Sequence, residues 1–197
     1  MKGGELRELS VSEPALENDI SSIERAIGVD LPDDFRRVVL KFSSAVEFSW
    51  FLPDELVRPE EFREIFSGGC SWNLPRLVEI EELRRGWVNE CFPNAEDPYD
   101  LVWHNKLAFH EVGNGDLLSL DLSISSAPVV YLSHDDGEGH GYRFGENFID
   151  FIERWSMLGC PGSEDWQMLP FTNSPTSGLQ PYCENAVRWR DWFGLTV

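Results

Sequence analysis

The run HDDGEGH, from His134 to His140, holds the densest group of chemically reactive side chains in the sequence. Carboxylates suit calcium or magnesium and imidazole suits zinc, so the run could bind a divalent cation or serve acid–base catalysis. Its spacing fits neither an EF-hand loop nor two histidines one helical turn apart, and its glycines make a flexible platform. We therefore interpret it as a solvated turn in which Asp135 or Asp136 binds backbone amides, with no metal and no catalytic residue.

A second glycine-rich motif, Gly113-Asn114-Gly115-Asp116, could in principle cradle a phosphate. It lacks the G-K-[ST] end of a P-loop, and a leucine stands where the third glycine of a dinucleotide motif belongs. Glycines that allow positive φ in a hairpin turn explain it better. Ser71 and Ser133 lie in no G-x-S-x-G elbow, so the sequence offers no nucleophile. We predict that the chain is not an enzyme.

Charge limits the possible partners of this 197-residue chain. Its 35 acidic and 16 basic side chains give a formal charge of -19, which repels nucleic-acid phosphates and anionic lipid. We expect no nucleic-acid and no membrane partner; an acidic surface favours a basic protein, although solubility alone would also explain it. The sequence has no recognisable signal peptide and no long apolar run, which predicts a cytoplasmic protein. The scattered cysteines indicate free thiols and no zinc site or other cofactor.

Two helices and a strand are predicted in the N-terminal part. Apolar residues from Leu16 to Ile27 recur every three or four positions, and Gly28 stands where a C-terminal cap belongs. A second helix follows Pro32 and extends to Phe42. The β-branched and aromatic residues of 46–52 then predict a strand. Residues 54–100 read as a partly helical insertion, with helical patterns at 59–66 and 77–91 separated by a Gly-Gly pair.

The second half of the sequence predicts three short antiparallel strands followed by a helix. The strands are expected at 107–112, 116–122 and 128–132, and the helix at 146–158. Residues 159–181 are rich in Gly, Pro, Ser and Thr and predict a long surface loop. The aromatic residues of 182–193 predict a closing helix that docks on the domain or on a partner.

Four blocks in this order resemble the SUKH superfamily, which includes the Smi and Knr cell-wall-assembly regulators of yeast and many bacterial toxin-immunity proteins. The blocks are IERAIGVDLP with Phe35, GNGD leading to Leu120-Asp121, PVVY with His134, and NFIDF, and they span roughly 13–158. The resemblance implies an α+β fold, a mostly antiparallel sheet flanked by helices. We expect a single SUKH-like domain over 13–158 with the insertion at 54–100, and 159–197 as a C-terminal extension packed on it.

The resemblance also implies binding without catalysis. We expect an immunity protein that binds and neutralises a cognate polymorphic toxin, a basic and nuclease-type protein; the alternatives are a regulatory scaffold of the Smi/Knr type and, third, a metal-dependent hydrolase that uses HDDGEGH. Partner contacts are predicted at polar residues of the loop and at three tryptophans, for which core packing is the competing interpretation. These residues are Asp135, Asp136, Glu138, His140, Trp50, Trp72 and Trp103.

Overall fold

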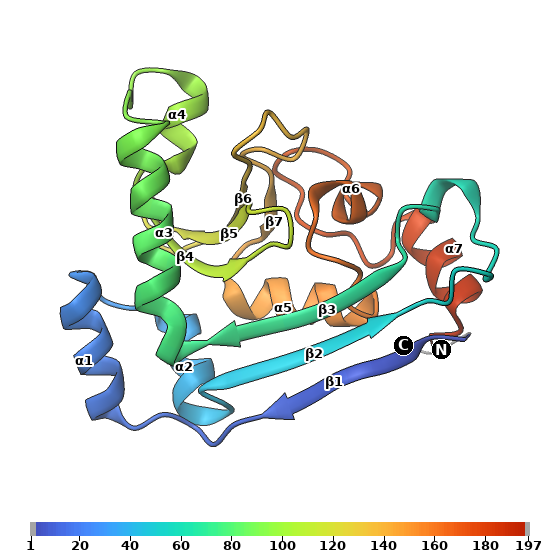
Figure 1. Ribbon diagram of the computed structural model, residues 1–197, viewed down its shortest axis with the longest axis horizontal. Helices are drawn as coiled ribbons and strands as arrows, with labels where there is room; N and C mark the ends of the chain where they lie inside the picture. The colour runs from blue at the N-terminus through green and yellow to red at the C-terminus, as the bar shows by residue number, and fades with distance from the viewer. Residues whose placement is uncertain (1–2, 196–197) are drawn as a thin grey trace.

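Two antiparallel sheets organise the computed structural model, which describes residues 3–195 (Figure 1). The first sheet has the order β1-β2-β3 and the second the order β4-β5-β6-β7. β3 and β4 are edge strands of their respective sheets and lie close to each other, so the two sheets meet there. The strands are β1 (Glu5–Val11), β2 (Ala45–Phe51), β3 (Ser67–Asn73), β4 (Lys106–Glu111), β5 (Leu117–Asp121), β6 (Val129–Leu132) and β7 (Arg143–Gly145).

The helices cover both sheets, and each buries one apolar stripe. α1 ends at Gly28, whose φ of 76° is the left-handed conformation that glycine adopts without strain. α3 packs against β4, and α5 packs against β7 and α2. The helices are α1 (Glu17–Ile27), α2 (Asp33–Lys41), α3 (Leu77–Glu90), α4 (Pro98–Trp103), α5 (Phe148–Met157), α6 (Asp165–Met168) and α7 (Glu184–Phe193), with 3-10 turns at Glu60–Phe62, Leu74–Arg76 and Leu169–Phe171.

One large hydrophobic core joins the first sheet, the second sheet and α5. Trp50 of β2, Phe109 of β4 and Trp155 of α5 are all buried in it. The C-terminal segment belongs to the same core, because Trp189 of α7 lies 6.4 Å from the Trp50 ring and is fully buried. A smaller cluster around Trp103 fills the space between the helices α3 and α4 and the other face of the second sheet.

The α+β class predicted from the sequence is confirmed, and so are the three consecutive antiparallel strands β4, β5 and β6. Several local features differ from the prediction. β1, α4 and β7 were not predicted; the helical pattern at 59–66 is only the short turn Glu60–Phe62; and Gly68-Gly69 lie inside β3 instead of in a break. A Cβ on Gly68 would stand 2.1 Å from the carbonyl oxygen of Cys160, so close packing against the segment after α5 requires glycine in this strand.

Candidate functional site

The loop that carries HDDGEGH is anchored at its far end by His140. The Ser133 amide donates to His140 Nδ1 at 3.0 Å, and His140 Nε2 donates to the Tyr99 carbonyl oxygen at 3.0 Å. The imidazole also stacks on the Tyr99 ring at 3.8 Å, and burial lowers its pKa. This pattern of one accepting and one donating nitrogen describes a neutral histidine. His140 therefore holds the loop in place, with both ring nitrogens engaged inside the protein.

The start of the loop is tied to the GNGD hairpin through Asp116, which is 1% exposed. One Asp116 oxygen accepts from the Tyr131 hydroxyl at 2.6 Å and from the Asn114 side-chain amide at 2.8 Å. The other accepts from the His134 amide at 2.8 Å and from His134 Nδ1 at 2.6 Å. Burial and the Asp116 charge raise the pKa of Tyr131, so its hydroxyl keeps its proton. The carboxylate is satisfied by four donors.

Asp116, His134 and Asp135 are the residues that could approach a metal, since one donor atom of each lies within 4.8 Å of the others. The Asp116 oxygens and the His134 nitrogen already bind each other or neighbouring donors. A cation would have to replace these hydrogen bonds. The group is better described as the buried link between the hairpin and the loop than as a metal centre.

Carboxylates gather where this loop meets α6: the exposed Asp135 and Glu138 and the buried Asp165 line a hollow of about 480 Å³. Trp166, 43% exposed, stands on its rim. Within residues 3–195, none of the ion pairs to Lys, Arg or His involves any carboxylate of this group. Burial, together with the charges of Asp116 and Asp165, raises the pKa of Glu164 to about 7. We call this group the acidic face; it comprises Asp135, Asp136, Glu138, Glu164 and Asp165.

The residues predicted from the sequence to contact a partner fall into exposed and buried groups in the structure. Asp135, Asp136 and Glu138 are exposed on the acidic face, whereas His140 is half-buried beneath it. The three tryptophans proposed as anchors are buried, with exposures of 1%, 3% and 0%, so the competing interpretation of core packing describes Trp50, Trp72 and Trp103. The Nε1 of Trp50 donates to the Gly159 carbonyl oxygen and that of Trp72 to the Ser43 carbonyl oxygen.

Glu164, Asp165 and Trp166 were missed in the sequence because they lie in the segment 159–181, which lacks periodicity and was predicted as a loop. Part of that segment is the single helical turn α6, which presents these residues beside the HDDGEGH loop. The amide of Gly139 donates to Asp165 Oδ2 at 2.8 Å and fixes this proximity. The acidic and aromatic run in an otherwise small-residue segment was the signal available.

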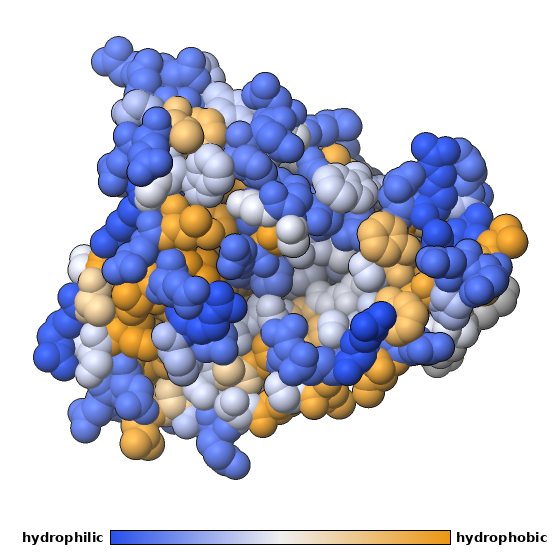
Figure 2. Space-filling view, in the orientation of Figure 1, coloured by the Kyte–Doolittle hydropathy of each residue, from blue (hydrophilic) through white to orange (hydrophobic). Residues whose placement is uncertain are grey.

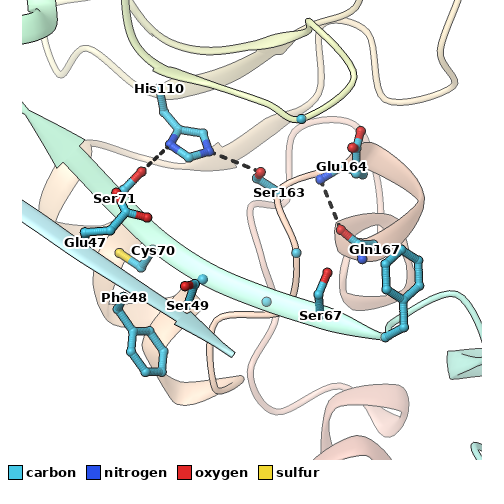
Figure 3. A pocket seen from close by; sticks show the side chains of 15 residues that line it. Glu47, Phe48, Ser49, Ser67, Cys70, Ser71, His110, Ser163, Glu164 and Gln167 are labelled. Atoms are coloured by element: carbon cyan, nitrogen blue, oxygen red, sulfur yellow. Dashed lines mark hydrogen bonds between the residues drawn. The ribbon is translucent and has the colours of Figure 1, made fainter. Parts of the chain in front are cut away.

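A second hollow, of about 290 Å³, lies over β2 and β3, and Figure 3 shows its lining. Ser49 and Ser67 form its floor, and His110 and Ser163 lie on the opposite wall. It continues into a neighbouring hollow of about 250 Å³, with which it shares His110 and Glu47. We call the two together the central groove. Figure 2 shows a pale hollow above β3, where residues of intermediate hydropathy line this face.

The central groove contains a Ser–His pair that resembles a catalytic nucleophile and its general base. Ser71 Oγ lies 2.8 Å from His110 Nδ1, and His110 Nε2 lies 3.1 Å from Ser163 Oγ. A catalytic base needs a group that stabilises its protonated form, usually a carboxylate on the other nitrogen. Here that nitrogen meets a hydroxyl, and burial lowers the pKa of His110 to about 4. The pair links β3, β4 and the segment after α5, and the lowered pKa makes His110 a weak base for Ser71.

Fold and site define an α+β domain whose Asp116 network is hydrogen-bonded inside the protein and whose surface carries carboxylates outside any ion pair of the described residues. A profile of the SMI1 / KNR4 family (SUKH-1) matches residues 14–154, and the chain belongs to this family, whose members are generally non-catalytic. Comparisons with curated proteins and with solved structures give no match. Among residues 3–195, no helix combines the length and the apolar character needed to cross a bilayer.

Proposed function

We propose that this chain is a non-catalytic protein-binding domain of the immunity type, which binds and neutralises a basic, nuclease-type toxin domain. The observation that carries the proposal is the acidic face: Asp135, Glu138 and Asp165 line one hollow, Asp136 and Glu164 are their neighbours in the chain, and the ion pairs of the described residues lie elsewhere. The charges of Asp135, Asp136 and Glu138 are exposed and rigidly presented by a loop anchored at both ends. Family membership supports a binding role of this kind.

The acidic face can bind a basic partner by electrostatic attraction alone, without a catalytic step. A nuclease grips phosphates with Lys and Arg, and an acidic domain can cover the same groups by charge complementarity. The overall charge of -19 speeds encounter with such a partner and repels nucleic acid and anionic membranes. Trp166 at the rim adds an aromatic surface on which a guanidinium or ammonium group can stack.

A regulatory scaffold is the second candidate, because the matching family profile is the one named for SMI1 and KNR4. Such a scaffold would use the same acidic face for a basic partner that is not a toxin. The product of the adjacent gene separates the two candidates. A toxin whose activity the chain suppresses supports immunity, whereas a binding partner without toxic activity supports the scaffold.

The proposal is tested by co-expressing the tagged chain with the product of the adjacent gene and measuring affinity after co-purification. Removing two charges of the acidic face with Asp136→Asn and Glu138→Gln should weaken binding about 10-fold to 100-fold. The matched control is Glu153→Gln with Asp191→Asn, which removes the same net charge from exposed helical positions. Equal weakening by the two double variants would show that only net charge matters, and no binding by the unmodified chain would refute the proposal.

A further inference from the structure

The central groove has a floor of small residues. Ser49 and Ser67 form much of this floor (Figure 3), and Gly69, Gly113 and Gly162 also line the groove. A Cβ on Gly69 would stand 2.5 Å from the Phe48 carbonyl oxygen, so this position stays bare. The Gly69 amide and the Ser67 carbonyl oxygen already bind Cys160 and Gly162, so a segment lying on this floor is held through the side chains of the groove.

Two floor hydroxyls have hydrogen-bonding capacity to spare. The side chains of Ser49 and Ser67 point into the groove in Figure 3, and within residues 3–195 neither hydroxyl takes part in an intramolecular hydrogen bond. By contrast, Ser71 and Ser163 are both engaged with His110. The groove therefore combines a fixed wall with a floor whose donors and acceptors are open to a ligand.

Two carboxyl groups in the groove favour a cationic ligand. Burial and the nearby charge of Glu8 raise the pKa of Glu47, whereas Arg76, which also lines the groove and is paired with Glu79, lowers it. Glu164 belongs to both the groove and the acidic face, and one of its oxygens is buried without a hydrogen-bond partner. A guanidinium group has five donors in a planar fork, which suits carboxylates and serine hydroxyls together. The groove thus has unmet acceptors of the kind that arginine satisfies.

We propose that the central groove is the docking site for a short extended segment of the protein partner, whose arginine or lysine side chains are held by Glu47 at one end of the groove and by Glu164 at the other. The inference builds on the proposed function and specifies where and how a basic partner is held. The acidic face attracts the partner over long range, and the adjoining groove binds one segment of it. Glu164 connects the two surfaces.

The test uses the full chain, labelled with ¹⁵N, and two pentapeptide probes, acetyl-Gly-Arg-Gly-Arg-Gly-amide and its citrulline counterpart. Citrulline keeps the shape of arginine and lacks its charge. The arginine peptide should shift the amide resonances of Ser49, Gly69 and Ser163, and the citrulline peptide should bind at least 10-fold more weakly. Shifts confined to the 134–140 loop, or equal binding of the two peptides, would overturn the proposal.

Variants of the chain test whether the peptide binds in the central groove. Ser49→Phe fills the groove and should weaken binding of the arginine peptide at least 10-fold, while Ser21→Phe, at an exposed position of α1, should leave it unchanged. Glu164→Gln keeps the volume of the groove and should weaken binding about 5-fold to 10-fold. Thermal unfolding of each variant checks that it is folded. If Ser49→Phe does not fold, the location is tested with Glu164→Gln and Ser67→Val, which should both weaken binding of the arginine peptide.

The outcome separates this inference from the proposed function. If Ser49→Phe and Glu164→Gln bind the co-purified protein partner as tightly as the unmodified chain, the groove is not the docking site, although the chain remains a binding protein. If the partner binds and both variants weaken it while Ser21→Phe does not, the groove is part of the interface.

Discussion

Replacing Glu164 by glutamine should stabilise the folded protein at high pH. The pKa of this carboxyl is raised from its ordinary 4.5 to about 7, mainly by burial and then by the charges of Asp116 and Asp165. Above this pKa the folded state must hold a charge that the unfolded state holds more easily. Because the folded pKa is the higher one, the associated stability is fully present below about pH 4.5 and is lost as the pH rises through about 7.

The size of the effect follows from the same shift. A rise from 4.5 to about 7 corresponds to about 3.4 kcal/mol between the two protonation states. The carboxyl is partly open to solvent, which reduces the effect to roughly 1–2 kcal/mol. Glutamine resembles the protonated acid at every pH, so the variant should exceed the unmodified chain by this amount at about pH 8 and by less than half of it at about pH 4.5.

Urea unfolding at the two pH values measures the difference as a change in midpoint at constant slope. Glu153→Gln, which neutralises an exposed helical carboxylate, is the control for a general reduction of negative charge. A gain of equal size at both pH values, or an equal gain in the control, would refute the conclusion that the charged Glu164 carboxylate destabilises the folded state. Such a result would also remove part of the case for a cation in the central groove.

Further predictions concern the core, the loop and the partner. Tyr131→Phe should cost roughly 1–3 kcal/mol of unfolding free energy in urea titrations, because it leaves the buried Asp116 short of a donor; a neutral result would contradict the network. Trp189→Ala should cost about 3–5 kcal/mol, against about 0.5 kcal/mol for the exposed Val187→Ala, and similar losses would mean that α7 is not part of the core. His140→Ala should speed hydrogen exchange in the 133–140 loop, and unchanged exchange would disprove its anchoring role. The association rate with the partner should fall steeply with added salt, and a constant rate would exclude electrostatic steering.

Elements with regular local periodicity were predictable from the sequence. The apolar stripe of α1 and its terminal Gly28, and the short apolar runs of β4 to β6, are local signals that the fold preserves. β1 has no such run: its apolar residues Leu6, Leu9 and Val11 are separated by charged and polar residues, and all seven of its residues are exposed. A strand without a buried face gives no hydrophobic period by which it can be identified.

The site was less predictable because long-range packing assembles it. The sequence located the exposed loop carboxylates, but the raised pKa of Glu164 depends on Asp116 and Asp165, which only the folded chain brings near. Burial of Trp50 and Trp103 likewise follows from tertiary contacts. Composition alone cannot tell an aromatic anchor from a core residue, because both have the same side chain and differ in their neighbours.

The packing of α7 on β2 sets an order for folding during synthesis. Trp50 leaves the ribosome roughly 140 residues before Trp189, which at about 5–20 residues per second is a delay of roughly 7–28 seconds. During this interval the Trp50 side chain lacks its contacts with Trp189 and Phe193, and this part of the core closes only when α7 has been made.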